Sequence, residues 1–167
     1  MSTALARHLL ACAALMAGAA VQAAEYNPHE PILGTWKIFD RVSGTVESLI
    51  EFKKQDGKYA GRLVHIYPDN PRTVHDCKKC PPPFRDQPLL GLPIVWNAVP
   101  DPNKPNAYIN GYALDPKTGK IYQGLGRVSE NGRILYLRGY VGASLLGRTE
   151  NWVRASDKEL TEAGLAP

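Results

Sequence analysis

The sequence predicts an all-β protein in which about eight antiparallel strands close into a barrel. Its 167 residues include 15 glycines and 14 prolines, which are poor helix formers and good turn formers. Short runs rich in β-branched and aromatic residues alternate with turns, and convincing helical periodicity is missing. A meander of this size forms a sandwich or a barrel, and we expect the barrel because closure removes exposed strand edges.

Three strands are predicted in the first half of the chain, at residues 33–41, 46–53 and 59–67. In the second strand, Ile50 and Phe52 alternate with charged neighbours, as expected for a strand with one buried face. The turn between the second and third strands is Asp56-Gly57. Both residues tolerate positive φ, and such a pair favours a tight hairpin.

An irregular segment at residues 68–88 follows, because it holds six of the 14 prolines and proline cannot donate to an internal ladder. Five further strands are predicted, at 89–99, 108–114, 121–128, 133–141 and 148–154. Glycines inside the predicted strands suit the sharp curvature of a barrel; they are Gly61, Gly111, Gly124, Gly126 and Gly139. The expected organisation is a signal peptide at 1–23, a lead-in at 24–32, one barrel domain at 33–155, and a tail at 156–167 with room for one helical turn.

The first 23 residues have the pattern of a secretory signal peptide. Arg7 and His8 give a basic start, residues 9–21 form an apolar run, and Ala23 ends a segment suited to signal peptidase. The run is too short and too rich in alanine for a transmembrane helix, so an uncleaved anchor is the weaker alternative. We therefore expect an exported protein, periplasmic or secreted, with no integral membrane span after processing.

The charge and the motifs exclude several function classes. Lysine and arginine number 20 against 16 aspartates and glutamates, a net charge of +4. This balance is far from the basic stripe of a nucleic-acid-binding protein, so no nucleic-acid partner is expected. The sequence has no Gly-x-Ser-x-Gly elbow, no glycine-rich phosphate loop and no zinc-protease helix motif. We expect no catalytic residue, no cofactor and no metal site.

Cleavage after residue 23 removes Cys12 and leaves Cys77 and Cys80 as an even pair separated by two lysines. In an exported protein such a pair is expected to form a disulfide, here one that tethers a proline-rich loop. Two alternatives stay open. A redox pair would need a cysteine of low pKa, which the intervening lysines favour, and a metal site would need two further ligands.

The first candidate ligand site surrounds one hairpin. Asp115, Lys120 and Tyr122 could bring a carboxylate, an amine and a phenol together at a barrel mouth. The alternative, which we favour, is turn chemistry, because Asp115 precedes a proline and Gly119 can supply a positive φ. Tyr112 could stack on a ligand, although such aromatic residues more often pack within a sheet.

The second candidate ligand site lies on the last two predicted strands. Arg138 and Tyr140 share a face of one strand, and Arg148 and Glu150 share a face of the next. Facing inward, they would line a polar, positively biased pocket for an acidic ligand; facing outward, they would form solvated cross-strand pairs. On the strand that carries Arg138 and Tyr140, the opposite face is more apolar and is the better candidate for the interior. We therefore favour the outward position for the cluster.

Gly34-Thr35-Trp36 opens the first predicted strand and resembles the Gly-x-Trp motif that opens lipocalin-type barrels. In those barrels the tryptophan closes the narrow end, and an arginine from the last strand covers it. The resemblance implies that Trp36 closes this barrel, and that Arg148 and Arg154 are the candidates to cover it through a cation–π contact.

A longer series of motifs resembles one bacterial family. The motifs, in chain order, are Asp76-Cys77-x-x-Cys80, Pro88-Leu89-x-Gly91-Leu92, Gly111-x-x-x-Asp115-Pro-x-x-Gly119-Lys120-x-Tyr122, Leu137-Arg138-Gly139-Tyr140-Val141-Gly142, Gly147-Arg148-Thr149 and Trp152-x-Arg154. The series is similar to the exported family known as domain of unknown function 2147. The resemblance implies a lipocalin-like barrel and an exported bacterial protein, and it implies no activity.

Fold and compartment together suggest a function by analogy. We expect an exported, non-enzymatic protein of the cell envelope that binds a small apolar or amphipathic ligand inside the barrel. One alternative is a structural protein with a packed barrel, whose contact surface is the loop tethered by Cys77 and Cys80. A small enzyme that uses the polar cluster of the last strands is the least favoured alternative.

Overall fold

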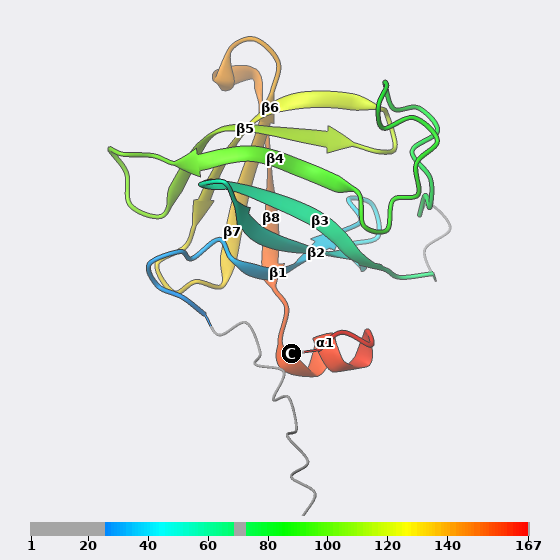
Figure 1. Ribbon diagram of the computed structural model, residues 1–167, viewed down its shortest axis with the longest axis horizontal. Helices are drawn as coiled ribbons and strands as arrows, with labels where there is room; N and C mark the ends of the chain where they lie inside the picture. The colour runs from blue at the N-terminus through cyan, green and yellow to red at the C-terminus, as the bar shows by residue number, and fades with distance from the viewer. Residues whose placement is uncertain (1–25, 69–72, 167) are drawn as a thin grey trace, which may run out of the picture.

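The computed structural model describes residues 26–68 and 73–166, which form one closed antiparallel barrel and a short helix near the carboxy terminus (Figure 1). Each strand pairs with the next along the chain, and β8 returns to pair with β1. The strands are β1 (Gly34–Phe39), β2 (Val46–Gln55), β3 (Lys58–Ile66), β4 (Pro93–Pro100), β5 (Ala107–Asp115), β6 (Lys120–Val128), β7 (Ile134–Tyr140) and β8 (Arg148–Arg154). The predicted all-β, lipocalin-like barrel of about eight strands is confirmed.

The strand bounds differ most from the prediction at β4, which begins at Pro93 rather than at residue 89. Leu89 belongs to the preceding loop, where its backbone N–H donates to the carbonyl of His75 at 2.7 Å. The chain then turns at Gly91, whose φ of +85° favours glycine. The apolar character of this stretch therefore comes from a buried loop residue and not from a longer strand. The predicted signal peptide lies outside the described residues, and export stays a prediction.

The interior of the barrel differs between its two ends. At the end where β2 turns into β3, large side chains fill the interior, and the ring centroids of Phe52 and Trp152 lie 6.5 Å apart. The alternation of β7 buries Leu135 and Leu137 in this interior, as their apolar pattern predicts. At the opposite end the interior is hollow. The hollow end therefore has room for a ligand.

The packed end of the barrel is closed by Trp36, which is fully buried on β1. The guanidinium of Arg154 lies over the indole, 4.1 Å from Cζ to the ring centroid. Arg154 also donates hydrogen bonds of 2.6, 2.7 and 2.8 Å to the backbone carbonyls of Pro31, Leu33 and Gly132. Burial lowers the pKa of Arg154. The arginine thus joins β8, the lead-in segment and the β6–β7 turn across this end.

The carboxy-terminal tail forms the helix α1 (Asp157–Glu162), which begins with a capping box between Ser156 and Glu159. The Glu159 carboxylate also accepts a 2.7 Å hydrogen bond from Lys37 on β1, so the helix is tied to the barrel wall. Burial raises the pKa of Glu159, but hydrogen bonds from Lys37 and Ser156 outweigh burial and lower it to about 2.

The docking of α1 is therefore expected to weaken in acid. Since the folded-state pKa of Glu159 lies below the ordinary value of 4.5, its contribution to stability is complete above about pH 4.5 and is lost as the pH falls toward 2. Urea unfolding at a series of pH values should show less acid destabilisation in Glu159→Gln than in the wild type. Glu162→Gln is the matched control on the same helix, because Glu162 is exposed and forms its ion pair with Lys158 of the helix itself. Equal pH profiles for Glu159→Gln and the wild type would contradict the assignment.

Candidate functional site

The hollow end of the barrel contains a cavity of about 540 Å³. It is surrounded by the β1–β2, β3–β4, β5–β6 and β7–β8 loops, and we call the opening between them the mouth (Figure 1). Cavities that hold small molecules usually measure about 300–1,000 Å³. The cavity is therefore large enough for a small ligand, and the barrel is not packed shut.

The inner wall of the cavity is apolar. Its lining includes Leu63, Val95, Ala113, Leu137 and Trp152 from the strands and Leu89 from the β3–β4 loop. The irregular β3–β4 loop thus contributes to the wall of the cavity and packs against the barrel. Such a wall favours the apolar part of a ligand, because its transfer from water is favourable in proportion to the apolar area buried.

One polar group at the rim of the cavity centres on Lys117 in the β5–β6 turn. Its Nζ lies 2.7 Å from Glu47 Oε1 and 3.3 Å from Asp40 Oδ2. The carboxylate of Asp40 is buried, and its Oδ1 accepts backbone N–H bonds from Val42 and Ser43. Buried carboxylates need such partners to offset the loss of water. This group joins the β1–β2 and β5–β6 loops at the mouth.

A second polar group at the rim centres on Glu150 of β8. Arg41 Nε donates to Glu150 Oε1 at 2.8 Å, and Trp152 Nε1 donates to Glu150 Oε2 at 3.2 Å. The hydrogen bond with Glu150 raises the pKa of Arg41. Arg148 also lines the cavity, and among residues 26–68 and 73–166 its side chain has no hydrogen-bond or ion-pair partner. Its guanidinium is therefore available to a polar or anionic group of a ligand.

The β5–β6 hairpin combines turn chemistry with a position at the cavity. Asp115 Oδ1 accepts from the Lys117 backbone N–H at 3.0 Å, and its carbonyl accepts from the Gly119 N–H at 2.7 Å. Asp115 and Tyr122 also line the cavity, whereas Lys120 is exposed and does not line it. Asp115 therefore both stabilises the turn and lines the cavity. Lys120 is not brought to the cavity.

The favoured outward position of the late-strand cluster is right for Arg138 and wrong for Arg148 and Glu150. Arg138 donates to Thr149 Oγ1 on the outer face at 3.1 Å, whereas Arg148 and Glu150 line the cavity. The reason is the alternation of side chains along a strand. Trp152 faces the interior, so Glu150 and Arg148, which lie two and four residues before it on β8, face the interior as well. The cluster is thus divided between the two faces of the sheet.

Two tyrosines that we considered as ligand contacts lie on or near the outer face. Tyr112 is exposed and stacks on Trp96, with ring centroids 5.8 Å apart. Tyr140 pairs with Gln123 in the β6–β7 ladder and reaches the rim of the cavity. Only Tyr140 of these two is placed where it could contact a ligand.

The two arginines considered for the closed end lie at opposite ends of β8. Arg154 covers Trp36, and Arg148 lies at the mouth. They are six positions apart, which is about 20 Å along an extended strand. Arg148 therefore belongs to the cavity rather than to the closure.

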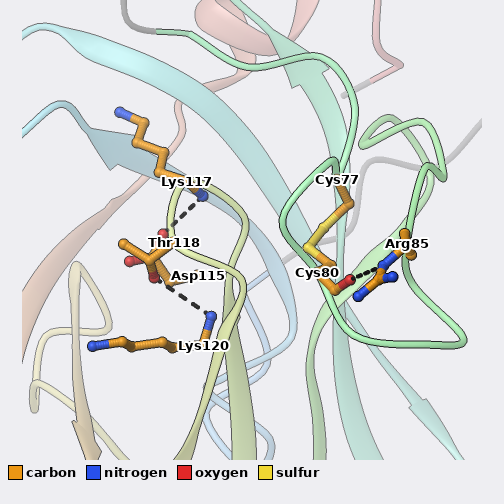
Figure 2. The surroundings of a disulfide bond; sticks show 7 residues. All are labelled: Cys77, Cys80, Arg85, Asp115, Lys117, Thr118 and Lys120. Atoms are coloured by element: carbon orange, nitrogen blue, oxygen red, sulfur yellow. Dashed lines mark hydrogen bonds between the residues drawn. A yellow bond between two sulfur atoms is a disulfide. The ribbon is translucent and has the colours of Figure 1, made fainter.

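Cys77 and Cys80 form a disulfide in the β3–β4 loop, and both residues are fully buried (Figure 2). Arg85 Nε donates to the carbonyl of Cys80 at 3.1 Å. Figure 2 shows this loop beside the β5–β6 turn, and a Cβ on Gly119 of that turn would overlap the carbonyl oxygen of Lys79. The disulfide loop therefore packs closely against one side of the mouth.

Replacing Gly119 with alanine is expected to detach the disulfide loop from the β5–β6 turn. Gly119 has φ +76°, which costs a non-glycine residue about 1–3 kcal/mol, and the overlap with Lys79 adds to that cost. Gly142→Ala is the matched control, since Gly142 has φ +71° and no atom within 4 Å of its Cβ position. Limited proteolysis within residues 73–92 and urea unfolding would compare the variants. Equal behaviour of the two would contradict the packing argument.

Sequence reasoning missed Asp40, Arg41, Glu47 and Lys117, which form most of the polar rim. Asp40 follows a predicted strand and precedes Ser43-Gly44, which marks it as a turn residue. No local pattern indicates its pairing with Lys117, because the two lie 77 positions apart.

Within residues 26–68 and 73–166, no group of three or more histidine, cysteine, aspartate or glutamate residues is arranged to hold a metal ion. None of the helices in that part of the chain has the length and apolar character needed to cross a membrane.

The comparisons with known proteins agree with this architecture. Protein HP1028 from the human pathogen Helicobacter pylori, described as belonging to the lipocalin family, is similar in structure, with a TM-score of 0.68 at 21% sequence identity. The similarity covers 81% of this chain and 90% of the other, and at this identity it shows the fold alone. No curated protein matches the sequence. The model of a family described as an uncharacterized protein conserved in bacteria, DUF2147, matches residues 34–154, and the chain belongs to that family.

Proposed function

We propose that this protein binds a small amphipathic molecule, with the apolar part of the ligand inside the barrel and its polar end among the charged residues at the mouth. The observation that carries the proposal is the cavity of about 540 Å³, which has an apolar wall and a polar rim at one end of a barrel whose other end is closed. Ligand sites commonly combine such a wall with a few placed polar groups.

The proposed role is that of a binding protein in the bacterial cell envelope and not that of an enzyme. The amino-terminal sequence pattern supports export. The polar cluster considered for catalysis is divided between the two faces of the sheet, which leaves Arg148 and Glu150 at the cavity and Arg138 outside it. An open cavity also argues against a purely structural barrel.

Native mass spectrometry of protein purified from its own cells tests the proposal. We expect a bound species that disappears after extraction with organic solvent, and binding of the fluorophore 1-N-phenylnaphthylamine by the extracted protein. The fluorophore should quench Trp152, which lines the cavity. A protein that carries no small molecule and fails to bind the fluorophore would contradict the proposed function.

A further inference from the structure

Large apolar side chains are exposed on two of the loops at the mouth. Val42 of the β1–β2 loop is 77% exposed, and in the β7–β8 loop Val141 is 69%, Leu145 89% and Leu146 85% exposed. Val42, Val141 and Leu146 line the same cavity, so both loops border its opening. The β7–β8 loop, orange in Figure 1, projects beyond the neighbouring strands. Such a gathering of apolar side chains on a surface indicates that something covers it.

The projecting loop is held in a defined shape. Arg138 donates from Nε to the Ser144 carbonyl at 2.8 Å and from Nη2 to the Leu145 carbonyl at 3.1 Å. The Leu146 N–H and the Gly147 N–H bond to carbonyls at the start of a single 3-10 turn, Ser144–Leu146. The two leucines are therefore presented to solvent by a hydrogen-bonded loop, and Arg138 has a positioning role there.

The charges at the mouth are arranged in two layers. Arg41 and Arg148 are exposed, as is Lys120 on the β5–β6 hairpin. The carboxylates of Asp40 and Glu150, by contrast, are buried or half-buried and have cationic or hydrogen-bonding partners. On these loops and on the β5–β6 hairpin, the exposed charged side chains are thus basic and lie near exposed apolar ones. This combination is typical of surfaces that insert apolar side chains among lipid headgroups and attract anionic lipids through lysine and arginine.

We propose that the mouth docks on a lipid surface that carries anionic headgroups, with Leu145 and Leu146 inserted among the headgroups and Arg148 close to their charge. Docking in this orientation places the open end of the cavity against the lipid. A ligand could then pass between lipid and cavity with little exposure to water, and this last step rests on the proposed function. Docking itself does not depend on it.

Co-sedimentation with lipid vesicles tests the proposal. The protein should bind vesicles of phosphatidylcholine mixed with phosphatidylglycerol more strongly than vesicles of phosphatidylcholine alone. The double variant Leu145→Ser/Leu146→Ser should lower binding by about tenfold or more, because it removes two apolar side chains from the interface. Leu145→Met/Leu146→Met keeps the apolar character and should bind like the wild type.

A charge pair provides the second comparison. Arg148→Gln should weaken binding to the anionic vesicles by about fivefold, the effect of one cation near a charged membrane surface. Lys58→Gln is its matched control, because Lys58 is exposed at the start of β3, at the opposite end of the barrel. It should leave vesicle binding unchanged.

Three results would overturn the docking proposal: no binding to either kind of vesicle, equal binding by the double serine variant, or a dimer in sedimentation analysis that the double serine variant dissociates. Titration with 1-N-phenylnaphthylamine in the absence of vesicles separates this proposal from the proposed function. The single variant Leu145→Ser should still bind the fluorophore, because Leu145 does not line the cavity. Vesicle binding without any fluorophore binding would leave docking supported and the proposed function contradicted.

Discussion

Replacing Arg154 with alanine is expected to lower the free energy of unfolding by about 3 kcal/mol. The change removes three hydrogen bonds from a charged donor together with the contact on Trp36. Each such bond contributes about 1.5–3 kcal/mol, and water that reaches the freed carbonyls offsets part of the loss. Urea unfolding followed by tryptophan fluorescence would measure the effect, and the Tm should fall by about 10 °C.

Two further variants show whether the loss comes from the closed end itself. Arg133→Ala removes an exposed positive charge from the adjacent β6–β7 turn, and its effect should stay within about 0.5 kcal/mol. Arg154→Lys keeps the charge, but one ammonium cannot reproduce the planar fork that reaches three carbonyls, so its loss should be intermediate. If Arg154→Ala were no less stable than Arg133→Ala, Arg154 would not hold this end of the barrel together.

The fold could be predicted because its determinants are local. The Asp56-Gly57 pair predicts a hairpin, and both residues have positive φ, 51° and 76°. Alternation and turn signals place β8 at Arg148–Arg154, the bounds that the structure has. The register of one strand against the next follows from such short turns in a meander. The irregular segment before β4 was also predicted, but its end was placed too early, because the position of Leu89 depends on contacts within the loop.

The candidate site could be predicted only in part, because its polar groups come from elements that barrel closure brings together. Asp115 and Tyr122 were found through a local hairpin pattern, and they do line the cavity. The bond between Asp40 and Lys117, in contrast, joins the β1–β2 and β5–β6 loops. The volume of the cavity is also set by side chains from several strands, and no single segment encodes it.

Filling the cavity should abolish most of the ligand affinity. Ala113 of β5 pairs with Val95 on one side and Tyr122 on the other, and all three line the cavity. In Ala113→Trp an indole would occupy the space that the proposal gives to the ligand. We expect the affinity for 1-N-phenylnaphthylamine to fall at least tenfold, a loss of about 1.4 kcal/mol or more. Isothermal titration calorimetry would measure it without interference from the added tryptophan.

The neighbouring residue on the same strand supplies the matched control. Tyr112 faces outward and stacks on Trp96, so Tyr112→Trp adds the same indole to β5 outside the cavity and should leave the affinity unchanged. Overpacking an interior costs about 1–3 kcal/mol, but a cavity of about 540 Å³ has room for the new ring, and a small change in Tm is expected for Ala113→Trp. If a folded Ala113→Trp bound the fluorophore as tightly as the wild type, the ligand would lie outside the barrel and the proposed function would be wrong. If both variants lost affinity equally, the loss would come from a disturbed β5 and not from the filled cavity.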